Sequence, residues 1–255
     1  MTKCLKTAQT ALRGKTNGGI FYLFPQMILD VIYLLPLMFI WRVVTAGGVD
    51  AGMSLIQLLT YTYVAVLLSD LLKVHSYIND WDFDAKSAAL FTRPMSVYGQ
   101  VISRTVGEWM PNLLLFSLPM ALVAPLFGIA ILPRTLWVIP SLILCVSLGF
   151  AIEFISFCVT LRLRNVSWLT SVIRTAIIAF FSGTVIPFAI LPWGLDRWMA
   201  YQPFGSLGGA PLSLYVGSAE PLSIIPIQIF WNIIFWLIAV FWFQNSKERM
   251  VSFGG

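Results

Sequence analysis

Six long apolar segments divide the chain and limit what it can fold into. A helix needs about 20 apolar residues to cross a hydrocarbon core of about 30 Å. Runs of about this length lie at residues 20–44, 53–74, 101–127, 136–161, 168–191 and 221–243. Because 58% of the residues are hydrophobic and only 11% are charged, a soluble globule of 255 residues would lack polar surface. The sequence therefore predicts an all-α integral membrane protein, a single domain over residues 1–255 with six transmembrane helices.

Lysine and arginine residues indicate how these segments are oriented, because cytoplasmic loops of membrane proteins are enriched in both. Twelve of the sixteen lie at the start of the chain, around the junction of the second and third segments, after the fourth segment, or near the end. Only Arg42, Arg134 and Arg197 fall on the opposite side, and Arg174 is expected inside the fifth segment. Both termini are therefore predicted to be cytoplasmic. The pI of about 9.2 follows from this arrangement, so we expect contact with membrane lipid and no nucleic-acid partner.

The first 19 residues are predicted to form an amphipathic helix on the cytoplasmic membrane surface. Leu5, Ala8 and Leu12 share one side at helical spacing, and the basic residues lie mostly elsewhere. The GKT at residues 14–16 matches the end of a phosphate-binding loop, but Gln9 stands where that pattern needs its first glycine. No nucleotide site is expected in this chain.

Two connecting segments carry further expectations. Residues 75–98 form the longest cytoplasmic loop, with a short helix expected before Pro94. This loop is either a solvated connector or a helix that docks into a soluble partner, and the aromatic Trp81, Phe83 and Phe91 favour docking. Outside, residues 191–221 are rich in Trp, Tyr, Gly and Pro, so we expect one or two short helices that lie in the outer interface or re-enter the membrane.

Four ionisable residues fall inside the predicted spans, where a charge is costly and normally faces protein or water. They are Asp30, Glu108, Glu153 and Arg174. The last three are interpreted either as an ion-pair network between helices or as part of a substrate or proton route. The chain has one histidine and three cysteines without metal-ligand spacing, so no catalytic residue, metal site or bound cofactor is expected.

Two short sequences add to this layout. Residues 89–96 read ALFTRPMS, and the chain ends in ERMVSFGG. With the six spans, the leading amphipathic helix and the cytoplasmic loop, they resemble the membrane subunits of ATP-binding-cassette (ABC) exporters of the type-2 (ABC-2) permease family. The resemblance extends over nearly the whole chain and implies a coupling helix between spans two and three and a re-entrant segment before span six. It implies that an ATPase is contacted through Asp82, Phe83, Ala85, Ala88, Leu90, Phe91, Arg93 and Pro94.

The same resemblance implies a function. The chain would be a permease subunit without enzymatic activity of its own, working with two copies of a separate ABC ATPase that bind ATP and Mg. A second permease, identical or related, would complete the path in the cytoplasmic (inner) membrane of a prokaryote. The cargo would be an amphipathic, lipid-like, peptide-like or drug-like molecule moved outward. The alternatives are a secondary transporter driven by an ion gradient through Asp30, Glu108 or Glu153, and a membrane scaffold that transports nothing.

Overall fold

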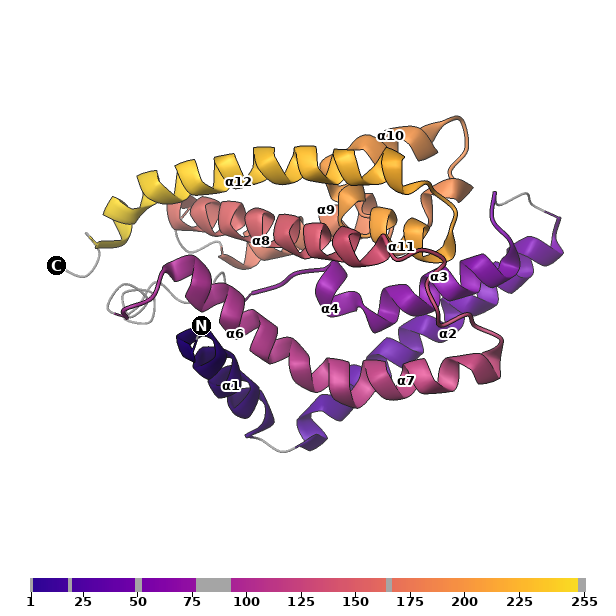
Figure 1. Ribbon diagram of the computed structural model, residues 1–255, viewed down its shortest axis with the longest axis horizontal. Helices are drawn as coiled ribbons and strands as arrows, with labels where there is room; N and C mark the ends of the chain where they lie inside the picture. The colour runs from indigo at the N-terminus through magenta and orange to yellow at the C-terminus, as the bar shows by residue number, and fades with distance from the viewer. Residues whose placement is uncertain (1, 18–19, 49–51, 77–92, 164–166, 252–255) are drawn as a thin grey trace.

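The computed structural model describes residues 2–17, 20–48, 52–76, 93–163 and 167–251. Every regular element in these ranges is a helix (Figure 1). In chain order the elements are α1 Thr2–Thr16, η1 Ile20–Leu23, α2 Phe24–Ala46, α3 Leu55–Leu67, α4 Ser69–Leu72, α6 Val97–Asn112, η2 Leu113–Ser117, α7 Leu118–Val123, η3 Ala124–Phe127, α8 Val138–Leu163, α9 Ser167–Phe181, η4 Phe188–Ile190, α10 Leu195–Tyr201, η5 Pro203–Ser206, α11 Gly209–Val216 and α12 Pro221–Val251.

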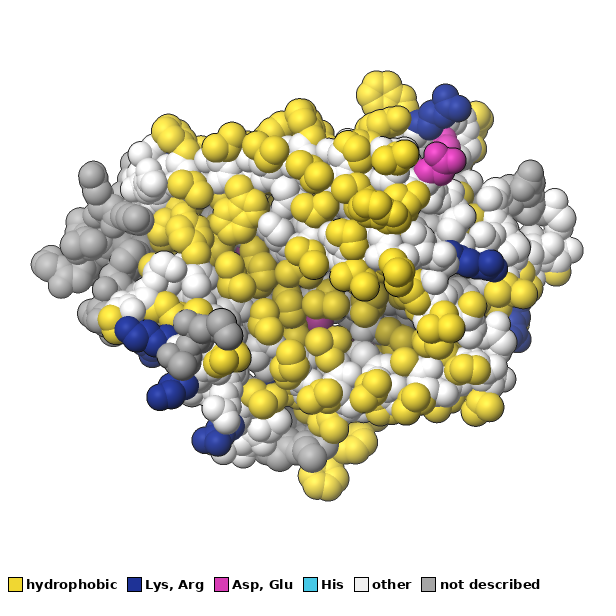
Figure 2. All heavy atoms as spheres, viewed as in Figure 1, with side chains coloured by type: hydrophobic (Ala, Val, Ile, Leu, Met, Phe, Trp, Pro, Cys, Tyr) yellow, Lys and Arg dark blue, Asp and Glu magenta, His cyan; other side chains and the backbone are white. Residues whose placement is uncertain are grey.

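Four helical stretches are long and apolar enough to cross a membrane, namely Phe24–Ala46, Val97–Phe127, Val138–Leu163 and Pro221–Ser246. They coincide with the first, third, fourth and sixth segments predicted above. Large apolar side chains remain exposed along them, and Figure 2 shows hydrophobic side chains over much of the visible face. A surface in water rarely carries so much contiguous apolar area. The helical, membrane-type character predicted from the sequence is confirmed at this level.

The second and fifth predicted segments hold shorter helices than expected. In the second, α3 ends at Leu67 and the chain continues after Leu68 as the one-turn α4. In the fifth, α9 ends at Phe181, just before Gly183 adopts a positive φ of 74° that a right-handed helix cannot contain. At 1.5 Å per residue, α3 and α9 are each about 20 Å long, less than the hydrocarbon core of about 30 Å.

Helix α8 is the central element of the described fold. Of its most apolar window 61% is buried, against 17% for the corresponding windows of α2 and α12. It packs along α12 over most of its length, and Figure 1 shows the two running side by side. Its other neighbours are α4, α9 and α11. Glu153, which is fully buried on α8, therefore meets protein rather than lipid.

The segment predicted to lie outside the membrane contains two short helices, α10 and α11, joined by η5. Helix α11 packs against α3, α8 and α12, and most of its residues are buried. Its start is fixed by the N–H of Gly209, which donates to the carbonyl of Ser182 at 2.6 Å. By contrast, Trp193 and Trp198 beside and within α10 are largely exposed. The segment thus has one buried and one exposed helix.

Candidate functional site

The predicted coupling residues Asp82, Phe83, Ala85, Ala88, Leu90 and Phe91 lie outside the described residues. The structure instead describes how the chain enters and leaves residues 77–92. We call residues 73–76, with the side chains that hold them, the upstream anchor. We call residues 93–96, with the parts of α1 and α6 that hold them, the downstream anchor. The two anchors differ in chemistry.

An ion pair between α8 and α9 forms the centre of the upstream anchor. The guanidinium of Arg174 on α9 pairs with the carboxylate of Glu153 on α8. Their side chains are 6% and 0% exposed, respectively. The other carboxylate oxygen, Oε1 of Glu153, accepts from the backbone N–H of Ser76 at 2.7 Å and from its hydroxyl at 3.0 Å. A buried pair is tolerated only when its remaining hydrogen-bonding capacity is met in this way.

Arg174 also reaches the chain just before residue 77. Its Nη1 donates to the carbonyl of Val74 at 3.2 Å, and its Nη2 lies 2.5 Å from Nδ1 of His75. Since a guanidinium only donates, that imidazole nitrogen accepts. Gly149 on α8 leaves room for this approach, because a Cβ there would lie 2.5 Å from Cγ2 of Val74. Residues 74–76 are therefore fixed to two helices through one buried network.

The downstream anchor is built on α1 and α6. Lys3 donates to the carbonyl of Pro94 at 3.4 Å, and the thiol of Cys4 lies 3.8 Å from the sulfur of Met95. Ser96 then caps α6, because its hydroxyl accepts from the N–H of Gly99 at 3.2 Å. These contacts involve exposed or half-buried groups, so this anchor is close to solvent.

Close packing holds α1 against α6. Gly107 of α6 has no Cβ, and one built there would lie 2.2 Å from the carbonyl oxygen of Ala8. Lys15, in the last turn of α1, donates to the backbone carbonyl of Glu108 at 2.8 Å. The predicted N-terminal helix therefore exists as α1, and it is packed on α6, the helix that follows residues 77–92.

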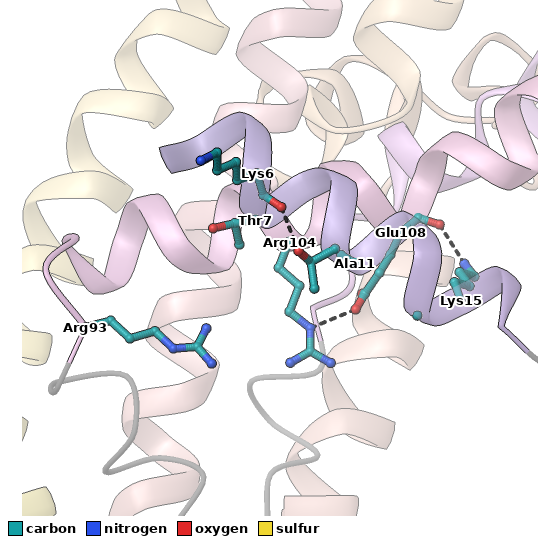
Figure 3. A pocket seen from close by; sticks show the side chains of 9 residues that line it. Lys6, Thr7, Ala11, Lys15, Arg93, Arg104 and Glu108 are labelled. Atoms are coloured by element: carbon teal, nitrogen blue, oxygen red, sulfur yellow. Dashed lines mark hydrogen bonds and ion pairs between the residues drawn. The ribbon is translucent and has the colours of Figure 1, made fainter. Parts of the chain in front are cut away.

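A basic cavity of about 640 Å³ opens at this contact. It is lined by residues of α1, by the chain at Arg93 and by α6, as Figure 3 shows. The lining residues are Lys6, Thr7, Thr10, Ala11, Gly14, Lys15, Arg93, Arg104 and Glu108. Nε of Arg104 donates to the Glu108 carboxylate at 2.8 Å within α6. Glu108 thus belongs to this cavity and not to a network with Glu153 and Arg174.

Asp30 occupies a third, separate position on α2. Its carboxylate accepts from the side chain of Gln26 at 3.1 Å and lines a small cavity of about 50 Å³, which Lys73 also lines. Lys73 lies 5.8 Å from the ring centroid of Tyr33. The four ionisable candidates are therefore divided among three places, and only Glu153 and Arg174 meet.

Sequence reasoning missed Ser76 and the contact of His75, because nothing in their spacing points to α8 or α9. The Arg104–Glu108 pair did have a signal, since residues four apart share a helix face. Among the described residues, no group of three or more His, Cys, Asp or Glu could hold a metal ion. The geometry of the buried network joins residues 74–76 mechanically to α8 and α9.

Fold and site together define a helical chain of membrane type, with two differently built anchors around residues 77–92. Comparison with family models, with curated proteins and with solved structures returned no significant match.

Proposed function

We propose that this chain is the membrane-spanning permease subunit of an ATP-driven ABC exporter of the ABC-2 type. The four long helices provide four of its six spans, and α3 with α4 and α9 with residues 182–190 provide the shorter two. Both termini lie in the cytoplasm and residues 191–221 re-enter from outside. The membrane is the cytoplasmic membrane of a prokaryote. Short helices are tolerated at membrane depth when neighbouring protein packs against them, as α2 and α11 pack against α3.

One observation carries this proposal: the flanks of residues 77–92 are tied to different helices. Residues 74–76 are bound to α8 and α9, whereas residues 94–95 contact α1, which packs on α6. A loop that is pushed by a partner can move membrane helices only if its ends are attached to them. This attachment supports a coupling role for Asp82, Phe83, Ala85, Ala88, Leu90 and Phe91, with Arg93 and Pro94 setting the path into α6.

In this mechanism two ATPase subunits bind ATP and Mg and close on each other. Their motion reaches residues 77–92 and passes through the upstream anchor to α8 and α9, and through the downstream anchor to α6. Two permease subunits, identical or related, then switch between closed and open paths for an amphipathic cargo. In this mechanism the chain contributes residues 77–92, which transmit the motion, and half of the transport pathway. It does not hydrolyse ATP itself.

The pairing of the buried carboxylate favours this function over a gradient-driven carrier. A proton or ion carrier needs an intramembrane acid that can release its partner during the cycle. Glu153 instead holds Arg174 and both donors of Ser76 at once. Losing Arg174 would leave the buried carboxylate without its cation.

Co-purification tests the coupling. The chain, tagged, is co-expressed with the ABC ATPase encoded nearest to it, alone or with Phe83→Ala plus Phe91→Ala. The control is Trp193→Ala plus Trp198→Ala, which removes two aromatic side chains from the predicted external segment. We expect a stoichiometric complex that the first pair weakens and the control pair does not. A chain that purifies without any ATPase, or equal loss in both variants, would overturn the proposal.

Cys4 offers a test of orientation that needs only the natural chain. Cys4 is exposed, whereas Cys145 and Cys158 are buried. A membrane-impermeant maleimide should therefore label the chain in opened but not in intact cells. Trp193→Cys, in a chain that also carries Cys4→Ser, should be labelled in intact cells as well as in opened ones. Labelling of Cys4 in intact cells would place the N-terminus outside.

A further inference from the structure

The basic cavity between α1 and α6 is not used by the coupling mechanism. Of its described lining residues, four carry cationic side chains and one carries a carboxylate, a net charge of +3 for this part of the lining. The carboxylate, Glu108, is bonded to Arg104. Within the described part of the chain, Lys6 and Arg93 have no acidic partner. Among the described lining residues, positive charge therefore exceeds negative charge.

The geometry of the arginines fits an oxyanion with several acceptors. Figure 3 shows the guanidinium of Arg93 extending toward that of Arg104 from the opposite side of the cavity. Like charges repel when they converge, and a phosphate between them would accept from both. A guanidinium matches the oxygens of a phosphate with two parallel hydrogen bonds. The hydroxyls of Thr7 and Thr10 already donate to the carbonyls of Lys3 and Lys6, so the cations are the donors here.

The surroundings indicate where such a phosphate comes from. Helix α1 contains four basic residues and no acidic one, and Figure 2 shows basic side chains gathered over the region of α1. Leu5, next to Lys6, is 63% exposed. Exposed apolar and basic side chains on one helix are typical of a helix that lies in a lipid surface. A volume of about 640 Å³ also exceeds what a bare phosphate ion fills and lies in the range of small-molecule sites.

We propose that this cavity binds the phosphate of an anionic phospholipid headgroup, such as phosphatidylglycerol, from the leaflet on which α1 lies. Lys6, Arg93 and Arg104 hold the phosphate, and the acyl chains lie along the exposed side of α1 near Leu5. The bound headgroup then joins α1, α6 and the residues that follow the cytoplasmic loop. This site does not depend on the transport function, only on the chain lying in a membrane.

Binding is measured on the purified full-length chain without any ATPase, by native mass spectrometry in detergent with phosphatidylglycerol or phosphatidylcholine added. The test variant is Lys6→Gln plus Arg93→Gln. The matched control is Arg13→Gln, which removes an exposed cation of the same helix that does not line the cavity. Each variant is first compared with the parent by thermal melting, so that a misfolded chain is recognised.

We expect phosphatidylglycerol to bind in preference to phosphatidylcholine, and the double variant to lower that affinity by on the order of tenfold. Arg13→Gln should leave the affinity unchanged, and Arg93→Lys plus Lys6→Arg should retain most of it. Equal loss in Arg13→Gln would show that the whole helix attracts anions without a site, which overturns the proposal. Full displacement of the lipid by inorganic phosphate or glycerol phosphate would assign the cavity to a soluble anion instead.

Discussion

The two anchors both attach a flank of residues 77–92 to the helices, but they do so through different kinds of contact. The upstream anchor uses a fully buried ion pair, Glu153 with Arg174, whose hydrogen bonds end on residues 74–76. The downstream anchor uses an exposed lysine, a backbone carbonyl and the packing of α1 on α6. Buried charges have no water to replace a lost partner, whereas exposed charges do.

This difference predicts how each anchor responds to force. Moving residues 74–76 relative to α8 must break both hydrogen bonds from Ser76 to the Glu153 carboxylate. Moving residues 93–95 relative to α1 exchanges weak contacts for water. The upstream anchor is therefore expected to be rigid and the downstream anchor flexible. A force that a partner applies to residues 77–92 would then move mainly α8 and α9, whereas α1 could shift relative to residues 93–95.

The largest effect is expected from removing one partner of the buried pair. Arg174→Met leaves the Glu153 carboxylate buried without its cation, and the free energy of unfolding should fall by about 3–5 kcal/mol. Unfolding in mixed micelles titrated with SDS measures it. Glu108→Gln is the matched control, because it breaks the Arg104 pair, whose side chains are 45% and 11% exposed, and should cost under about 1 kcal/mol.

A double variant separates charge from packing at the same place. Glu153→Gln with Arg174→Met removes both charges, so it should be more stable than Arg174→Met alone. If the double variant were instead the less stable of the two, the loss would come from packing, and the comparison of the two anchors would lose its electrostatic basis.

The next effect concerns the contact of α1 with α6. Gly107→Ala places a Cβ where the carbonyl oxygen of Ala8 lies 2.2 Å away. Because backbone cannot rotate aside, we expect a loss of about 3 kcal/mol or detachment of α1. Cross-linking Cys4 to Met95→Cys with a short bifunctional maleimide reports detachment. Gly14→Ala is the control, since a Cβ there meets nothing within 4 Å, and unchanged cross-linking in Gly107→Ala would contradict the packing.

A smaller effect is expected at Ser76. Ser76→Ala removes the hydroxyl bond to Glu153 at 3.0 Å and keeps the backbone bond at 2.7 Å. A hydrogen bond to a charged group contributes about 1.5 kcal/mol at the low end of its range, and the same SDS titration measures it. Ser218→Ala, which removes a hydroxyl bond in an exposed turn, serves as control. If both variants lost the same free energy of unfolding, the hydrogen bond from Ser76 to the carboxylate would be no stronger than that of an exposed hydroxyl.

The sequence predicted the long helices well because their signal is local. Twenty or more predominantly apolar residues suffice to define α2, α8 and α12, even though Pro36 lies inside α2 and Pro226 inside α12. The early end of α9 was not predicted, although Ser182 and Gly183 stand there. Their effect depends on α11, whose Gly209 N–H is bonded to the carbonyl of Ser182. That contact joins residues far apart in the chain, and the local pattern of apolar residues carries no information about such contacts.

One interpretation of the sequence placed Glu108, Glu153 and Arg174 in an ion-pair network between helices, and the structure pairs Glu153 with Arg174. A charge inside an apolar run is visible in the sequence, so Glu153 and Arg174 could be named. Their pairing with each other and with Ser76 depends on how α8, α9 and residues 74–76 pack. Glu108 was grouped with these residues because the sequence does not show which helices pack together. In the structure Glu108 pairs with Arg104 of its own helix.

The smallest effect should come from Lys3, at the exposed anchor. Lys3→Ala removes a bond of 3.4 Å to the carbonyl of Pro94, which water can replace, so the free energy of unfolding should change by no more than about 0.5 kcal/mol. Added salt should abolish even that difference, because an exposed charge is screened within about 10 Å at 0.1 M. Arg174→Met should keep its deficit in the same salt series, since ions do not reach a buried pair. If Lys3→Ala proved as costly as Arg174→Met, the downstream anchor would be rigid too, and the loop would move α6 as strongly as α8.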